Sequence, residues 1–352
     1  MRTAPQRDRH RRHRLAPLPR RDGAGDEGGA DHRPPTRGRE RATGSEPLST
    51  GPVVIALGGG GARGLAHVGV LEVLEETAIR PDRIVGVSIG GIVGAAYAFE
   101  PDSSVILKRV VDYVTGDTFQ AHQRAMMGAS RGPSNGDSAD KGATVGWFNQ
   151  IREYLRANRI FKRVITKKAL LASQLLKDVA ENLLPDADIA DAKIPLTIVA
   201  VDLRSGRRVV LEKGSLRKAV RGSASLPGIF PPVELDGMLL ADIGIFSPLP
   251  THECRYYNPS LLIAADVSPV IDPIEDCDTA LSVMMRMEEI SGTVFRDHVL
   301  SLADVVIHPE VGNLPWSDFT QAVELIDRGR DAARKVRDEL LPQIHTQRLP
   351  SA

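Results

Sequence analysis

The stretch PVVIALGGGGARGLAHVGVLEVLEETAIRPDRIVGVSIGGIVGAAYAF, residues 52–99, contains two glycine-rich turns, and each turn follows a short apolar run and precedes a helical pattern. The runs Val53–Leu57 and Arg83–Val87 are typical of strands that are buried on both faces of a parallel sheet. After the first turn, apolar residues recur at a spacing of three and predict a helix. The repeated order of strand, turn and helix predicts an α/β fold.

The first turn carries four consecutive glycines, Gly58 to Gly61, followed by Ala62, Arg63 and Gly64. Glycine has no Cβ, so such a turn can adopt conformations and close approaches that other residues forbid. Its backbone amides can then point at a ligand near the start of the following helix. This turn is therefore predicted to receive an anion or an oxyanion.

The second turn reads Gly86-Val87-Ser88-Ile89-Gly90, which is the pattern G-x-S-x-G. In a nucleophile elbow of this kind, a serine stands on a sharp strand-to-helix turn, and the glycines avoid clashes where strand and helix cross. The five-residue pattern alone occurs by chance in roughly one chain in ten of this length. The strand before it, the helix after it and the glycine turn on the preceding strand make Ser88 the candidate nucleophile.

Composition sets broad limits on the fold and the partners. The chain has 352 residues, of which 42% are hydrophobic and 26% charged, and its formal net charge is zero. This length suffices for one large domain with a sizeable core, and the neutral balance gives no support for a nucleic-acid partner. Cys254 and Cys277 do not form a C-x-x-C pair, which excludes a disulfide scaffold and a thiolate zinc site.

Residues 1–50 differ from the rest, because they are rich in arginine, proline and glycine and poor in large apolar side chains. Such a segment cannot offset its ordering entropy by burial, so it is predicted to be a disordered basic tail. It lacks the apolar core of a signal peptide, and no run in the chain approaches 18 apolar residues. The sequence predicts a cytoplasmic protein, with a peripheral position at the inner membrane face as an open option.

Strand and helix patterns alternate beyond residue 99 without a clear linker, which predicts one domain over residues 51–345 and a mostly parallel sheet. Residues 128–146 are small, polar and glycine-rich and are predicted to form a flexible loop. Basic residues cluster over 152–168 ahead of an amphipathic stripe that ends at Leu183. Either this stretch docks on an anionic membrane surface, or it is a core-facing helix with a solvated basic end.

An activated serine needs a base, and Asp242 follows the second strand of a hairpin whose turn is predicted at Asp236-Gly237. A carboxylate at a strand end, beside small residues and a proline-rich loop, is placed like a catalytic group. No histidine stands in a turn-rich context that marks it as catalytic. A Ser-Asp-His triad of the α/β-hydrolase type would use Asp242 with His298 or His308. In that fold, however, the nucleophile follows a strand well inside the chain, whereas Ser88 follows only the second strand after the tail.

Two nucleotide-binding readings of the first turn fit less well. Gly59, Gly61 and Gly64 satisfy the dinucleotide pattern G-x-G-x-x-G, but that fold needs an acidic residue at the end of the next strand, where this sequence has Gly86-Val87-Ser88. A P-loop is excluded because no Lys-Ser or Lys-Thr pair follows the glycines.

Three motifs in order resemble the patatin-like phospholipases, most closely the bacterial members related to the neuropathy target esterase catalytic domain. They are G-G-G-x-R-G at residues 59–64, G-x-S-x-G around Ser88, and the loop Pro227–Pro232 followed by an Asp with a Gly two residues later. The resemblance covers about Pro52 to Leu340. It implies a three-layer α/β/α sandwich with a mostly parallel central sheet.

The resemblance also implies the chemistry: a Ser-Asp dyad without histidine, in which Ser88 is the nucleophile and Asp242 takes its proton. The glycine turn, with Gly59, Gly60, Gly61, Arg63 and Gly64, would form the oxyanion hole. Gly86 and Gly90 would shape the elbow. The implied activity is hydrolysis of ester bonds in phospholipids, lysophospholipids or other acyl lipids at a membrane or micelle surface, without calcium, another metal or a cofactor.

One position departs from the family pattern. The D-G-[GA] signature stands here as Asp242-Ile243-Gly244, and a β-branched residue does not adopt positive φ without strain. If the turn required positive φ at Ile243, Asp242 would be displaced and the activity reduced. A catalytically silent patatin-fold protein that binds a lipid or a partner is the alternative that this residue favours.

Overall fold

The computed structural model describes residues 51–77, 79–128, 173–244, 247–269, 273–274 and 280–348. The predicted tail, all but the first residue of the predicted loop over 128–146, and the basic cluster over 152–168 lie outside the described residues. Among the described helices, none combines the length and the apolar character that crossing a bilayer requires.

The described strands form one eight-stranded sheet whose centre is parallel. Five strands run in the same direction, in the spatial order β3 (Leu196–Asp202), β2 (Arg83–Val87), β1 (Val53–Leu57), β7 (Leu261–Ala265) and β8 (Val305–Ile307). Three strands complete the sheet at the β3 end and include antiparallel pairs: β4 (Arg207–Leu211), β5 (Val233–Leu235) and β6 (Met238–Ala241). The predicted mostly parallel sheet is confirmed.

The two faces of the sheet bury separate apolar cores, as the alternation of side chains along a strand requires. In β1, Ile55 and Leu57 pack into one core with the helices α1 (Ala66–Glu76), α2 (Ile89–Phe99), α3 (Ser103–Thr115), α6 (Leu216–Ser223) and α9 (Ala322–Arg348). Val54 and Ala56 pack on the other face with α7 (Thr251–Cys254) and the end of α8 (Ala280–Leu300). This confirms the predicted three-layer α/β/α sandwich.

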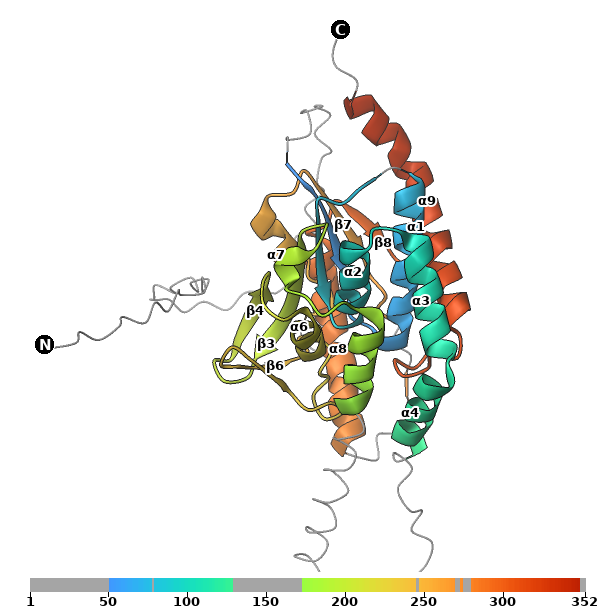
Figure 1. The fold of residues 1–352 in the computed structure, drawn as a ribbon. Coiled ribbons are helices and arrows are strands. Elements are labelled where there is room, and N and C mark those ends of the chain that lie inside the picture. The colour runs from blue at the N-terminus through green and yellow to red at the C-terminus, as the bar shows by residue number, and fades with distance from the viewer. Residues whose placement is uncertain are drawn as a thin grey trace, which may run out of the picture. The chain divides into compact units, whose positions relative to one another are not determined.

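On the first face, α1, α3 and α9 lie side by side (Figure 1). The helix α4 (Asp117–Gly128) follows α3, and residues 173–183 are also helical. The helix α3 begins at Asp102, whose carboxylate accepts hydrogen bonds from the amides of Ser104 and Val105, as expected of an N-cap.

The predicted hairpin between β5 and β6 is also present. Its turn residues Asp236 and Gly237 both have positive φ, at 48° and 81°, which suits the turn types that connect twisted antiparallel strands.

The pairing along β3 determines where two other strands end. One edge of β3 pairs with β4 over residues 198–202, so β2 and β6 must share the opposite edge. On that edge Val87 of β2 pairs with Val199, and Ala241 of β6 pairs with Val201. Because β6 runs antiparallel to β3, the carboxyl ends of β2 and β6 approach each other from opposite directions. The next residues of the two strands are Ser88 and Asp242.

Candidate active site

Ser88 stands on a sharp turn between β2 and α2, in a backbone conformation that is strained for any residue other than glycine. Its φ is 55° and its ψ is −125°. The chain can turn this sharply because Gly86 and Gly90 touch: a Cβ on Gly86 would lie 2.6 Å from the Gly90 carbonyl oxygen, and one on Gly90 would collide with the end of β1. The structure therefore gives the two predicted elbow glycines a steric role.

A buried hydroxyl group holds the amide of the elbow serine. The Ser88 N–H donates to Ser223 Oγ at 2.9 Å, and Ser223 Oγ donates in turn to the Val199 carbonyl oxygen at 2.6 Å. Ser223, at the end of α6, thus ties the strained turn to β3. The role of Ser223 was not predicted from the sequence, in which the only signal is the run of small residues from Ser223 to Ser225.

Replacing Ser223 by alanine is expected to leave the Ser88 amide without its buried acceptor and to loosen the turn. Labelling of Ser88 by a fluorophosphonate probe should then slow by about tenfold, which is the rate equivalent of one lost hydrogen bond. The matched control is Ser225→Ala, because the Ser225 hydroxyl donates to the Arg221 carbonyl and does not bond the turn. Equal labelling rates for the two variants would contradict this role of Ser223.

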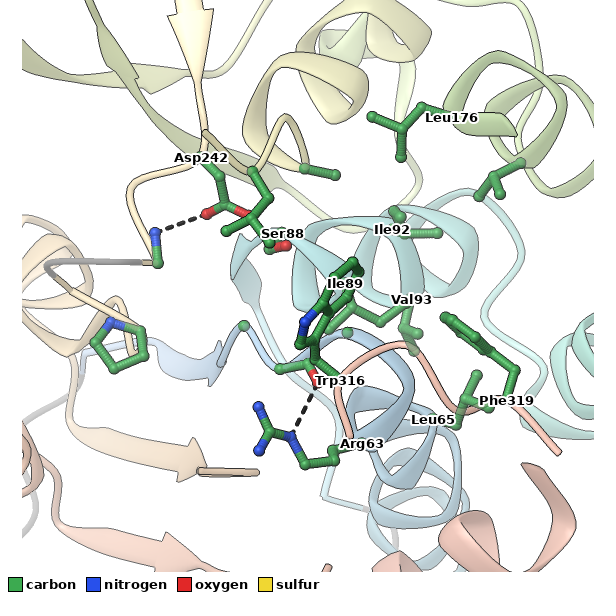
Figure 2. Close-up of a pocket in the computed structure, with 18 of the residues that line it drawn as sticks. Arg63, Leu65, Ser88, Ile89, Ile92, Val93, Leu176, Asp242, Trp316 and Phe319 are labelled. Carbon is green, nitrogen blue, oxygen red and sulfur yellow. Dashed lines mark hydrogen bonds between the residues drawn. The ribbon is translucent and has the colours of Figure 1, made fainter. Parts of the chain in front are cut away.

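Asp242 is nearly fully buried, with 4% of its surface exposed, and lies beside Ser88 (Figure 2). Burial raises the pKa of Asp242 from 3.8 to about 6, although hydrogen bonds from the Ser88 hydroxyl and the Gly244 amide partly oppose that shift. The Gly244 N–H donates to Asp242 Oδ1 at 2.6 Å and orients the carboxylate. Near neutral pH the group is an ionised but comparatively strong base.

Ile243 does not displace Asp242. Among the described residues, positive φ values occur at neither Ile243 nor Gly244, so this turn does not require the glycine that the family pattern has there. The Ile243 side chain is buried with Val87 and Leu249 instead. The isoleucine is therefore accommodated at this position without positive φ.

Backbone carbonyls hold the first half of the glycine turn. The Gly58 amide donates to the Ala265 carbonyl at 3.1 Å, and the Gly59 amide donates to the Pro248 carbonyl at 2.7 Å. Within the described residues, the amides of Gly60 and Gly61 have no acceptor. Of the five residues expected to form the oxyanion hole, Gly59 therefore has its amide engaged elsewhere, whereas the amides of Gly60 and Gly61 are open to a ligand.

Contacts with Arg63, Ile89 and Trp316 fix the shape of the turn. The Arg63 Nε donates to the Gly60 carbonyl at 3.1 Å, and Gly64 packs directly against Ile89. Gly61 has φ of 58°, and a Cβ there would collide with the Trp316 carbonyl oxygen, so no larger residue fits. Arg63 and Gly64 thus shape the turn.

His67 stabilises the glycine turn through its backbone. It is fully buried, and its Nε2 lies 2.8 Å from the Gly58 carbonyl oxygen. Burial lowers the pKa of His67 to about 4, so the ring is neutral at pH 7 and donates this hydrogen bond. Its contact is with the backbone of the turn and not with Ser88 or Asp242.

Within the part of the chain that the structure describes, no histidine completes a Ser-Asp-His triad with Ser88 and Asp242. His252 lies beside Arg208 and Glu253, and His308 pairs with Asp266 and not with Asp242. His298 is exposed on α8. The Asp242 carboxylate therefore lies beside Ser88 with no imidazole from these histidines between them.

A cavity of about 220 Å³ opens beside Ser88 and Asp242. Next to Ser88 it is lined by the glycine turn, and farther away it is lined almost entirely by apolar side chains (Figure 2). These belong mainly to α2, α3, α4 and the helical residues 173–183, and they include Ile92, Val93, Val114, Phe119 and Leu176. The shape and lining suit a hydrocarbon chain whose ester group lies at Ser88.

Comparisons with known proteins agree with the motifs. A family profile described as Patatin-like phospholipase matches residues 55–255, more than half of the chain. An uncharacterized NTE family protein of Mycobacterium tuberculosis is 30% identical over 216 residues, which are 61% of this chain and 49% of that protein. Human patatin-like phospholipase domain-containing protein 6 is 28% identical over 222 residues, 62% of this chain and 14% of that protein.

Among solved structures, VipD from Legionella pneumophila aligns with a TM-score of 0.42 and 15% identity, over 82% of this chain and 66% of VipD. The chain spans about half the length of the mycobacterial relative and a smaller part of the human one.

Proposed function

Because the chain belongs to the patatin-like phospholipase family, we propose that it is a serine acyl-ester hydrolase that acts on phospholipids, lysophospholipids or related acyl lipids. The observation that carries this proposal is the position of Ser88 beside the buried Asp242 carboxylate, at the end of an apolar cavity (Figure 2). The proposed reaction needs no metal ion and no organic cofactor.

In the proposed reaction, Ser88 Oγ attacks the acyl carbonyl carbon while its proton passes to Asp242. The negative charge that develops on the carbonyl oxygen is stabilised by the open amides of Gly60 and Gly61. The tetrahedral intermediate then collapses, the bond to the alcohol breaks, and the alcohol leaves with the proton from Asp242. Water attacks the acyl-enzyme in the same way, with Asp242 again as the base, and releases the fatty acid and free Ser88.

The proposed substrate class bears on where the protein works in the cell. Acyl lipids are presented at membrane or micelle surfaces, so the proposed enzyme works as a peripheral protein, in the cytoplasm or at the inner membrane face. The apolar lining of the cavity supports a chain drawn from such a surface.

A fluorophosphonate probe together with p-nitrophenyl acyl esters tests the proposal. An active serine hydrolase is expected to become labelled at Ser88, as peptide mapping would show, and to release p-nitrophenol. The alternative is a catalytically silent protein of the same fold that binds a lipid or a partner. The absence of both labelling and hydrolysis would leave only that alternative.

The pH dependence of kcat/KM is expected to report the ionisation of Asp242. The base must be deprotonated, so kcat/KM for a p-nitrophenyl ester should fall about tenfold for each pH unit below the pKa of about 6 and level off above it. Tryptophan fluorescence recorded at each pH controls for unfolding. An inflection near 4 would indicate that the carboxylate is solvated in the active enzyme.

A further inference from the structure

Three charged or titratable side chains next to the cavity have no part in the proposed reaction. Asp266 follows β7 directly and is buried, with 2% of its surface exposed. Its neighbour Ala265 accepts the hydrogen bond from Gly58 in the glycine turn. Arg296 comes from α8, and His308 follows β8. The carboxyl ends of β7 and β8 therefore bring these side chains together beside the first turn.

Asp266 fixes the orientation of the arginine. The Arg296 Nε donates to Asp266 Oδ2 at 2.7 Å, and His308 Nδ1 lies 2.8 Å from the Asp266 carbonyl oxygen and 3.3 Å from Oδ2. Burial raises the pKa of Asp266, but hydrogen bonds from His308, Ser268 and Arg296 outweigh it and hold the pKa well below its usual range. The carboxylate is thus ionised and anchors the guanidinium.

The guanidinium keeps donors free on the side away from Asp266. Its Nη2 lies 3.2 Å from His308 Nδ1, and its Nη1 has no acceptor among the described residues. Arg296 lines the cavity together with Ser268 and Thr293. The hydrogen bond to Asp266 also raises the pKa of His308 and favours its charged form. One carboxylate thus pairs with two cationic groups. This leaves positive charge available to the cavity.

The apolar residues of the cavity and Arg296 come from opposite layers of the sandwich. Ile92, Phe119 and their neighbours belong to helices on one face of the sheet, whereas Arg296 belongs to α8, which covers the other face. Ser88 stands between the two layers, at the carboxyl end of a central strand. An ester whose acyl chain fills the apolar part therefore directs its alcohol part toward the α8 side.

We propose that Arg296, which Asp266 holds in place, determines specificity by binding a phosphate group on the alcohol part of the substrate. A guanidinium with one edge fixed and donors left over matches the geometry of phosphate oxygens and forms charge-assisted hydrogen bonds with them. This inference rests on the proposed esterase function. It adds that the enzyme prefers esters that carry a phosphate to esters of the same acyl chain that do not.

Two esters with the same decanoyl chain, decanoylglycerol and decanoylglycerol 3-phosphate, test the proposal. The native protein should have the higher kcat/KM for the phosphate ester, and Arg296→Gln should lower the ratio of the two kcat/KM values by about 10- to 100-fold. The matched control is Arg286→Gln, which removes the same charge from the same helix outside the cavity lining and should leave the ratio unchanged. Arg296→Lys keeps the charge without the planar fork and should give an intermediate ratio.

The outcomes separate this inference from the proposed function. An equal loss on both esters in Arg296→Gln, or an unchanged ratio in both Arg296 variants, would overturn the inference. Hydrolysis of decanoylglycerol alone by the native protein would overturn it and leave the esterase function standing, whereas hydrolysis of neither ester would overturn both. Inhibition of decanoylglycerol hydrolysis by inorganic phosphate that depends on Arg296, without a preference between the esters, would assign the site to free phosphate and overturn a role in substrate choice.

Discussion

Replacement of Ser88 by alanine is expected to lower kcat for a p-nitrophenyl ester by roughly 10⁴-fold or more and to abolish fluorophosphonate labelling. Alanine has no oxygen to form the acyl-enzyme, so only the oxyanion donors and the binding cavity remain to accelerate attack by water. The measurement is single-turnover hydrolysis at pH 8, where Asp242 is ionised.

The alanine variant should remain folded, because its backbone amide still donates to Ser223 and its Cβ occupies the same position. Circular dichroism and a thermal melt control for this. Retention of more than about one hundredth of the native activity would show that the nucleophile is another residue.

Replacement of Asp242 by asparagine is expected to lower kcat by roughly 10⁴-fold. The amide oxygen can still accept the hydrogen bond from the Gly244 amide, so the geometry is kept while the basic group is lost. Hydrolysis of the same ester is the measurement. A loss of less than tenfold would mean that the proton of Ser88 is taken by another base.

The same substitution should change how stability depends on pH. The pKa of Asp242 is raised from 3.8 to about 6 on folding, so between these two pH values the native state binds more protons than the unfolded state and stability decreases as pH rises. Above pH 6 the cost is complete and amounts to about 3 kcal/mol, at 1.36 kcal/mol for each pH unit between the two values.

The asparagine variant lacks this cost. Its free energy of unfolding in urea, relative to the native protein, should therefore be higher at pH 7.5 than at pH 4 by an amount of this order. An identical pH dependence of the two proteins would show that the native carboxylate is not buried as described.

The candidate site residues could be predicted from the sequence where their placement depends on local patterns. The elbow glycines, Ser88 and the strand-end position of Asp242 are all readable from short segments, because each depends on the residues immediately around it. Figure 2 shows Ser88 and Asp242 together, although they are far apart in the chain.

Features that depend on distant segments were not predictable in this way. Ser223 bonds Ser88 across 135 residues, and the Gly59 amide is taken by a carbonyl in a loop near residue 248. Ile243 is buried with Val87 and Leu249, which lie in other segments of the chain, and a motif does not encode this packing. Similarly, Arg296 gains its orientation only because the ends of β7 and β8 lie next to each other.

The shared edge of β3 makes the proposed catalysis sensitive to the alignment of a single strand. Ser88 and Asp242 are each positioned by strands that hydrogen-bond to β3, two residues apart on it. A shift of β6 by one residue would move Asp242 by about 3.3 Å and turn its side chain to the opposite face of the sheet. Under the proposed function, turnover would then stop even in a compact protein with normal helix content. Ester hydrolysis would thus serve as a folding assay that distinguishes the native strand alignment from this slipped one.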